Sequence, residues 1–307
     1  MTKNYPMFDN EAVAILGASG QVGSEFVSLL KDDTNLIMPS SKQLNLAEVD
    51  QIYSWLNKNQ PTIIINAAAF TDVDGAENKR QEALALNAQL PSALASWCEC
   101  NHARLLHFSS DYVFSGGEAN IQNETVTPYP LNWYGKTKAM GDKFILDGNA
   151  NALILRSSWI YSEHHKNFLL SIIRQAQQKK KIFVVDDQIG TPTPANWLAK
   201  VGIYFLNKWH KPTNKVINAV PNGFVSWYDF ATSVTSYLNV KGFPMQIERV
   251  VPISSETLCQ TARRPKNSKL DNRYLSQHLD YEVDNWDSLM HDVVNKFLSN
   301  ISTIKSL

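Results

Sequence analysis

A tyrosine and a lysine near the middle of the chain have the spacing of a proton-transfer pair. Tyr134 and Lys138 are four residues apart in Trp133-Tyr134-Gly135-Lys136-Thr137-Lys138, so on a helix they share one face. A lysine ammonium beside a phenol favours the phenolate and lowers a pKa that is about 10 in free tyrosine. Such a tyrosine donates a proton to a developing alkoxide near neutral pH. Because many helices carry this spacing without any catalytic role, other motifs must support the interpretation.

A glycine-rich turn early in the chain is the first of these motifs. The wholly apolar residues 12–16 are typical of a strand buried on both faces. They lead into Gly17-Ala18-Ser19-Gly20-Gln21-Val22-Gly23, and residues 22–31 have helical periodicity. In this context the glycines allow close approach to a pyrophosphate, which the helix N-terminus binds. Candidate cofactor-binding residues are Gly17, Ser19, Gly20, Gln21, Val22 and Gly23. A glycine turn without a ligand is the alternative.

The end of the second predicted strand bears on the choice of cofactor. Residues 35–38 precede Pro39-Ser40-Ser41-Lys42, where the adenosine ribose of a dinucleotide would lie. An acidic residue here would prefer the free 2′-hydroxyl of NAD, but Ser40, Ser41 and Lys42 are not acidic. We therefore predict NADPH, with NADH as the alternative, since Lys42 could equally be a solvated surface lysine.

Further apolar runs alternate with helical stretches. Strands are predicted at 61–66, before Asn66-Ala67-Ala68-Ala69, at 104–109, before Ser110, and at 151–159. The helical stretch between the first two carries Asn87, and Pro91 either begins a new helix there or kinks this one. Strands that alternate with helices predict an α/β fold: a Rossmann-like, doubly wound parallel sheet with right-handed crossovers.

The pattern changes after residue 159. Helical segments near 168–178, 196–206, 226–238 and 287–297 are separated by loops that contain proline and glycine. We predict an NAD(P)-binding domain over 1–160 and a smaller, mainly substrate-binding C-terminal lobe over 161–307, with the chain returning to the sheet around 215–240. Asp187-Gln188 and Ala262-Arg263-Arg264-Pro265 could hold a phosphate-bearing substrate; surface charge is the alternative.

Composition narrows the class of protein. The 307 residues are 44% hydrophobic and 19% charged, which is ordinary for a soluble enzyme. Lys plus Arg equals Asp plus Glu at 29 each, so no basic field indicates nucleic acid or anionic lipid. No apolar run has membrane-spanning length, residues 1–10 are polar, and the three cysteines lack metal-ligand spacing. These features predict a cytoplasmic protein.

Together the motifs resemble the extended short-chain dehydrogenase/reductases and, within them, the dTDP-4-dehydrorhamnose reductase family. The resemblance runs from about residue 12 to the C-terminus. Besides the glycine turn and the Tyr/Lys segment, it rests on residues 66–74, 109–114, 156–161, 187–193 and 262–268. The last three segments are narrower than the superfamily motifs, and they fall in the part of the chain that should select the substrate.

The resemblance implies roles for individual residues. Tyr134 would be the general acid, Lys138 would lower its pKa and hold the nicotinamide ribose, and Ser110 would hydrogen-bond the substrate carbonyl. The reaction would be NAD(P)H-dependent reduction of C4 in a dTDP-4-keto-6-deoxy sugar to dTDP-L-rhamnose, for cell-surface polysaccharide. Cofactor contacts would also come from Asn66, Ala67, Ala68, Ala69 and Asn87, and substrate contacts from Ser110, Asp111, Trp159, Asn167, Arg263 and Arg264.

The resemblance also leaves alternatives open. Some relatives bridge a dimer through magnesium held by glutamates; Glu25 matches one of these, but Asn196 stands where a second is expected, so we predict no metal. A monomer or a homodimer is expected. The alternative functions are a non-catalytic nucleotide-binding regulatory subunit, a reductase of another nucleotide sugar, and a sugar-nucleotide dehydratase or epimerase that retains NAD.

Overall fold

The chain folds around one parallel sheet. The computed structural model describes residues 8, 11–31, 35–117, 120–208 and 215–305; apart from Phe8, the polar stretch 1–10 lies outside them. A six-stranded sheet has the order β10-β5-β4-β3-β1-β2, with every neighbouring pair parallel. Its strands are β1 (Ala12–Leu16), β2 (Asn35–Ile37), β3 (Ile63–Asn66), β4 (Arg104–Ser110), β5 (Asn151–Ser157) and β10 (Val216–Asn218). The strand order reverses between β1 and β3, which confirms the predicted doubly wound fold.

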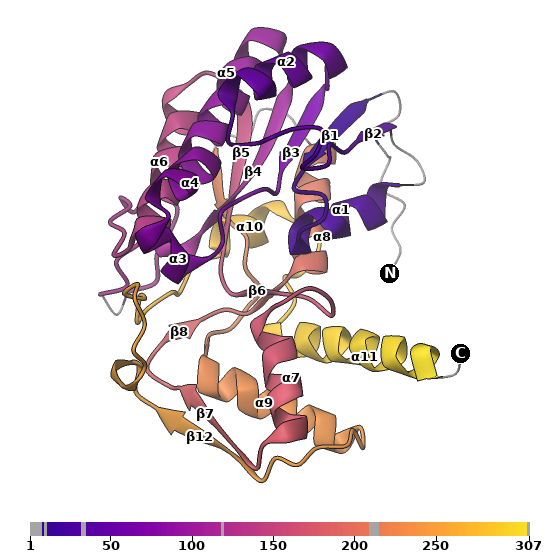
Figure 1. Cartoon of the computed structure of the whole chain (residues 1–307), viewed down its shortest axis with the longest axis vertical. Helices are drawn as coiled ribbons and strands as arrows, with labels where there is room; N and C mark the ends of the chain where they lie inside the picture. The colour runs from indigo at the N-terminus through magenta and orange to yellow at the C-terminus, as the bar shows by residue number, and fades with distance from the viewer. Residues whose placement is uncertain (1–7, 9–10, 32–34, 118–119, 209–214, 306–307) are drawn as a thin grey trace.

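Helices cover both faces of the sheet (Figure 1). On one face, α1 (Gln21–Leu30) and α8 (Ala195–Asn207) pack together. The other face carries α2 (Val49–Asn59), α5 (Leu90–Asn101) and α6 (Trp133–Asp147). Short helices complete this half: α3 (Val73–Asn78), α4 (Arg80–Leu84), the π-helix η1 (Ala85–Gln89), the 3₁₀ turn η2 (Asp111–Val113) and α10 (Arg273–His278).

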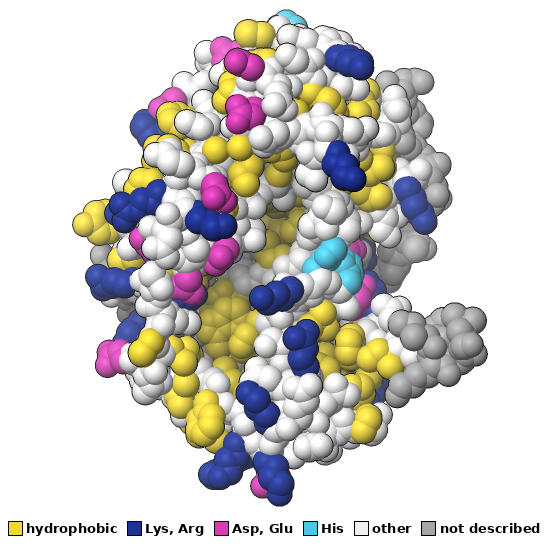
Figure 2. Space-filling model, in the orientation of Figure 1, with side chains coloured by type: hydrophobic (Ala, Val, Ile, Leu, Met, Phe, Trp, Pro, Cys, Tyr) yellow, Lys and Arg dark blue, Asp and Glu magenta, His cyan; other side chains and the backbone are white. Residues whose placement is uncertain are grey.

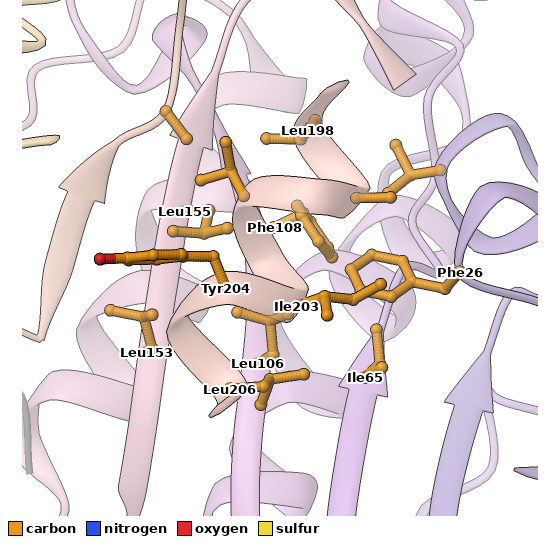
Figure 3. Packing of buried hydrophobic residues seen from close by; sticks show 14 of the residues in the cluster. Phe26, Ile65, Leu106, Phe108, Leu153, Leu155, Leu198, Ile203, Tyr204 and Leu206 are labelled. Carbon is orange, nitrogen blue, oxygen red and sulfur yellow. The ribbon is translucent and has the colours of Figure 1, made fainter. Parts of the chain in front are cut away.

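The strands are largely apolar because both faces of the sheet are buried. Ile64 and Leu105 belong to the hydrophobic cluster beneath α2 and α5, and Ile65 and Leu106 belong to the cluster beneath α1 and α8. Figure 3 shows Phe26 of α1 and side chains of α8 lying over the strand residues. Burial on both faces disfavours polar side chains in the middle of these strands, and the buried His107 in the middle of β4 is an exception.

A smaller lobe follows the sheet at the carboxyl ends of its strands (Figure 1, lower half). Its core joins α7 (Phe168–Gln178), α9 (Trp227–Val240) and α11 (Trp286–Lys305). The parallel pair β7 (Lys181–Val185) and β12 (Arg249–Ile253) lies against α9, and η3 (Ser255–Thr257) follows β12. Two small pairs complete the lobe, namely β6 (Ile160–Tyr161) with β9 (Thr193–Pro194) and β8 (Ile189–Gly190) with β11 (Val225–Ser226).

Two boundaries differ from those the sequence predicts. The strand predicted over 151–159 ends at Ser157, because Trp159 has a left-handed φ of +48° that no strand accommodates. The helical stretch around Asn87 is interrupted by the π-helix η1, and Pro91 lies at the start of α5, where its missing N–H costs nothing. Among the described helices, none has the length and apolarity required to cross a bilayer.

Gly141 gives a stability test of this packing. A Cβ on Gly141 would lie 2.2 Å from the carbonyl oxygen of Asn87, where α6 crosses η1. We expect Gly141→Ala to lower the free energy of unfolding by about 1–3 kcal/mol through overpacking, although alanine is the better helix former. Urea denaturation measures this change. Gly117→Ala, whose Cβ would have no neighbour closer than 3.9 Å, is the control; equal effects of the two substitutions would contradict the packing argument.

Candidate active site

The glycine turn forms a cradle at the carboxyl end of β1. Gly17 has φ +77°, and a Cβ there would lie 2.7 Å from the amide nitrogen of Ala68. A Cβ on Gly23 would lie 2.1 Å from the carbonyl oxygen of Gly17, so α1 packs directly on the turn. Gly20 is the N-cap of α1, and no side chain caps the helix. Its first N–H groups therefore remain available for an anion, as a dinucleotide pyrophosphate requires.

The segment after β3 lies beside this cradle and is held in place by Asn87. The side chain of Asn87 accepts a hydrogen bond from the amide of Phe70 (2.9 Å) and donates to the carbonyl of Phe70 (3.1 Å) and to Thr137 (3.2 Å). Both ends of the amide are thus used within the protein. Asn87 ties the segment 66–70 to α6, and its direct contact with the cofactor stays a prediction.

Ser40, Ser41 and Lys42 lie exposed in the turn that follows β2. The Ser40 hydroxyl donates to Oε1 of Gln43 at 2.9 Å, which shapes the turn. Since β2 is adjacent to β1, this turn lies at the same sheet edge as the glycine cradle.

Ser110 and Tyr134 meet at the carboxyl end of β4. Ser110 is the last residue of the strand, and its hydroxyl donates to Asp111 at 2.9 Å. Helix α6 begins one residue before Tyr134, where Asn132 caps it by accepting the Gly135 N–H at 2.8 Å. The Ser110 side chain is near enough to the Tyr134 hydroxyl to lower its pKa. The structure thus brings together two residues that lie 24 positions apart in the sequence.

The protonation of Tyr134 follows from burial. Desolvation raises the pKa of Tyr134 to about 12, while the nearby Ser110 side chain lowers it. The lowering by Lys138 that the sequence predicts is not among the causes, because Nζ of Lys138 donates instead to the Phe108 carbonyl at 2.6 Å. Tyr134 is therefore protonated at neutral pH, as a proton donor must be.

Lys138 is buried on the same face of α6. Desolvation lowers the pKa of Lys138 to about 8, and the charge of Asp142 raises it. Asp142 itself accepts from Nε of Arg156 (3.1 Å) and from the Ser109 hydroxyl (2.9 Å). The sequence analysis missed Asp142, although its position four residues after Lys138 places it on the same helix face.

The smaller lobe contributes a pair of stacked tryptophans. Trp159 stacks on Trp227 with ring centroids 3.6 Å apart and planes 9° from parallel. A Cβ on Gly190 would lie 2.7 Å from the Trp159 indole, so only glycine permits this ring position. Figure 2 shows hydrophobic side chains in the hollow between the two parts of the molecule. Trp227, which the sequence analysis missed, has no motif to mark it.

The comparisons with known proteins agree with this geometry. The family model described as RmlD substrate binding domain matches residues 11–299. A dTDP-4-dehydrorhamnose reductase of Aggregatibacter actinomycetemcomitans is 31% identical over 91% of this chain and 97% of its own length. The chain belongs to the dTDP-4-dehydrorhamnose reductase family.

Solved structures extend the similarity to three dimensions. The dTDP-4-dehydrorhamnose reductase of Bacillus anthracis, solved in complex with NADP, has a TM-score of 0.85 and 31% identity over 93% of this chain and 99% of its own. The orthologue from Clostridium acetobutylicum has a TM-score of 0.86 and 29% identity, over 94% of this chain and 99% of its own. The spore coat polysaccharide biosynthesis protein SpsK of Bacillus subtilis is 29% identical over 86% of this chain and 90% of its own length.

The two arginines that the resemblance implies as substrate contacts differ in their surroundings. Arg264 is held by Asp74 through two contacts of 3.2 and 2.6 Å, and this hydrogen bonding lowers the pKa of Asp74. Arg263 is exposed, and its carbonyl accepts from Asn132, the N-cap of α6. The segment that contains both arginines is thereby fixed beside the catalytic helix, with Arg263 the more accessible of the two cations.

Asn167 and Asp187 have structural partners. Asn167 caps α7 and donates to Oε1 of Gln21 at 3.2 Å, so it joins the smaller lobe to the first residue of α1. Asp187 accepts from the Ser255 amide at 2.9 Å and pairs with Lys266 at 3.1 Å. For both residues the structure shows a connecting role, and a substrate contact by Asn167 stays a prediction.

The residues around Glu25 do not form the glutamate site of some relatives. Asn196 turns its amide nitrogen to Glu25 at 2.7 Å, and a nitrogen donor cannot bind magnesium. His164 lies 3.3 Å from Glu25, and Lys296 lies 3.8 Å from Glu163. Ligand atoms of Glu25, Glu163 and His164 lie within 4.8 Å of one another. Side chains of this chain already contact both carboxylates, and the prediction of no bound metal stays a prediction.

Asp111 gives a pH test of the site. Burial raises the pKa of Asp111 to about 6 from 3.8, against hydrogen bonds from Ser268 and Ser110. The folded state therefore binds this proton more tightly than the unfolded chain. The resulting stabilisation is complete below about pH 4 and is lost as the pH rises through about 6. Relative to Asp111→Asn, wild-type protein should lose about 1–3 kcal/mol of unfolding free energy between pH 4 and pH 7.

Urea denaturation across this pH range measures the difference. Asp50→Asn, which removes an exposed carboxylate from the first turn of α2, should run parallel to wild type. A difference between wild type and Asp111→Asn that stays constant with pH would contradict the assignment.

Proposed function

We propose that this chain catalyses the NAD(P)H-dependent reduction of the C4 keto group of dTDP-4-dehydro-6-deoxy-L-mannose (dTDP-4-dehydrorhamnose), giving dTDP-L-rhamnose for cell-surface polysaccharide. The observation that carries the proposal is the placement of Ser110 next to Tyr134, with Lys138 one helical turn on, at the sheet edge that also carries the glycine cradle. Membership of the reductase family supplies the substrate class.

The residues present fit a dinucleotide. Gly17 and Gly23 let the turn pack closely against Ala68 and the start of α1, and the uncapped start of α1 supplies N–H donors for a pyrophosphate. When bound, the cofactor supplies the hydride that reaches C4 of the sugar. NADPH is the preferred cofactor in this proposal, supported by Ser40, Ser41 and Lys42 and by the NADP complex of the Bacillus anthracis relative.

In this proposal Tyr134 and Ser110 both contact the oxygen at C4 of the sugar. The Ser110 hydroxyl, which donates to Asp111 in the structure, donates instead to the carbonyl oxygen when the sugar binds and stabilises the negative charge that develops on it. Because burial keeps Tyr134 protonated, its hydroxyl supplies the proton that completes the alcohol. Asp111, Trp159, Asn167, Arg263 and Arg264 remain proposed substrate contacts, with Trp159 and its partner Trp227 forming the apolar wall for the deoxysugar.

A coupled assay tests the proposed function. The keto sugar is generated in place by an upstream dehydratase and epimerase, and loss of NADPH absorbance is followed, with NADH run alongside. Oxidation that requires every component and yields dTDP-rhamnose is expected. No oxidation by protein that demonstrably binds cofactor would refute the assignment, and tightly retained NAD in purified protein would favour a dehydratase or epimerase.

Replacing Tyr134 by phenylalanine removes the proton donor and little else. We expect kcat to fall by about 10²–10⁴-fold, while the cofactor Kd, measured by fluorescence titration, stays within about twofold. Tyr129→Phe, at a position 75% exposed, is the matched control and should retain full activity. Retained turnover in Tyr134→Phe would exclude this tyrosine as the acid, and a non-catalytic regulatory subunit would have no turnover to lose.

Lys42 tests the cofactor preference. If its ammonium contacts the 2′-phosphate, Lys42→Ala should raise the KM for NADPH by about 2–5-fold, as loss of an exposed ion pair would, and leave the KM for NADH unchanged. Initial rates with both cofactors measure the ratio. Lys58→Ala, which alters an exposed lysine in the last turn of α2, is the control. Equal changes with both cofactors would place the 2′-phosphate elsewhere.

We further infer that the enzyme acts in the cytoplasm as a monomer or a homodimer. Cys98, Cys100 and Cys259 are free thiols in the structure, which suits a reducing compartment.

A further inference from the structure

A buried polar group reaches Lys138 from behind the catalytic helix, and two of its three members have no part in the mechanism above. It consists of Asn66 at the end of β3, His107 in β4 and Lys138 in α6. Nδ2 of Asn66 lies 3.1 Å from Nδ1 of His107, and Nε2 of His107 lies 3.4 Å from Nζ of Lys138. Their exposed fractions are 1%, 0% and 2%, so no bulk water competes for these contacts.

The direction of each hydrogen bond in this group can be deduced from one backbone donor. The amide N–H of Ala68 can only donate, and it points at Oδ1 of Asn66 at 3.3 Å. The Asn66 oxygen therefore faces Ala68, and its NH₂ group faces Nδ1 of His107. Nδ1 must then accept. Desolvation and the nearby Lys138 lower the pKa of His107 well below its usual value, so the ring is neutral. Its single hydrogen is on Nε2.

That hydrogen points at Lys138. Nζ of Lys138 already donates to the Phe108 carbonyl at 2.6 Å. An amine can donate once and accept the ring N–H on its lone pair, whereas an ammonium has no lone pair and is opposed by the ring N–H. We propose that Asn66 and His107 are positioning residues that direct a ring N–H at Lys138 and thereby favour its neutral amine. The inference rests on the proposed function only in that Lys138 serves the reduction.

The other ionisable groups that face Lys138 act in known directions. Asp142, one turn along α6, favours the ammonium, but it shares its charge with Arg156 of β5. Tyr134, one turn before Lys138, is neutral because burial raises its pKa to about 12. Desolvation and the His107 N–H favour the neutral amine of Lys138, and Asp142 favours the ammonium. Both forms of Lys138 are therefore accessible near neutral pH. A reduction that uses the ammonium then slows as the pH rises through the pKa of Lys138.

Nitrogen NMR measures the tautomer of His107 in the wild-type protein. In protein labelled with ¹⁵N in its histidine rings, the two nitrogens of His107, assigned by their loss in His107→Phe, report which one carries hydrogen. Hydrogen on Nε2 is expected in the wild type. Hydrogen on Nδ1 would overturn the proposal, because the ring would then offer Lys138 a lone pair.

Asn66→Asp should reverse the direction of the hydrogen bonds that run from residue 66 through His107 to Lys138. One carboxylate oxygen still accepts from Ala68, and the other accepts from Nδ1–H, which turns the Nε2 lone pair toward Lys138. We expect the pKa of Lys138 to rise by at least one unit, a tenfold change in its proton affinity. The measurement follows the ¹³Cε signal of Lys138, identified by its absence in Lys138→Met. The alkaline limb of kcat/KM should move upward with it.

Repeating Asn66→Asp in the His107→Phe variant distinguishes an effect of the His107 tautomer on Lys138 from a direct effect of the aspartate charge. In His107→Phe the ring link is cut, so Asn66→Asp should move the pKa of Lys138 much less than it does when His107 is present. Equal shifts in the two backgrounds would mean that the aspartate charge acts through space and would overturn the proposal. If His107→Phe does not fold, the tautomer measurement on wild-type protein still decides, with His107 assigned by its contact to Asn66. A shifted pKa in protein that does not reduce the sugar would refute the proposed function alone.

Discussion

The close approach of α6 to its neighbours is the constraint on which the active site depends. A Cβ on Gly135 would lie 2.1 Å from the Tyr112 carbonyl, and one on Gly141 would lie 2.2 Å from the Asn87 carbonyl. Glycine at both positions lets the helix pack directly against η2 and η1. That packing places Tyr134 against Ser110 and buries Lys138 beneath the strand ends. A helix displaced by the width of a methyl group would move Tyr134 away from Ser110.

Burial then decides the protonation of the catalytic groups. Desolvation opposes charge, so it raises the pKa of Tyr134 and Asp111 and lowers the pKa of Lys138 and His107. A reductase needs a protonated phenol in its resting state, and the environment of Tyr134 supplies one without help from the lysine. The lysine and the phenol are thus governed by separate contacts, although the chain places them one helical turn apart.

The second part of the chain completes the site from the other side. The Trp159–Trp227 stack and the Asp74–Arg264 pair both join segments far apart in the sequence. Asn167 and Gln21 join the start of α7 to the start of α1, so the cofactor cradle and the substrate lobe share a polar contact. The Asp74–Arg264 pair and the Asn167–Gln21 contact connect the two lobes, whose hydrophobic cores are separate, whereas the two tryptophans pack within the smaller lobe.

Local sequence determined much of this protein. Apolar runs determined the buried strands, the glycines after β1 determined the cofactor turn, and the spacing of Tyr134 and Lys138 determined that they share a helix face. These features depend only on residues near one another in the chain, and the narrow motifs of the second half identified the family. The pairing of Trp227 with Trp159, the internal role of Asn87 and the direction of the Tyr134 pKa were decided by tertiary structure alone. Each depends on residues distant in sequence that pack together, and burial by those residues sets both the ring positions and the cost of charge.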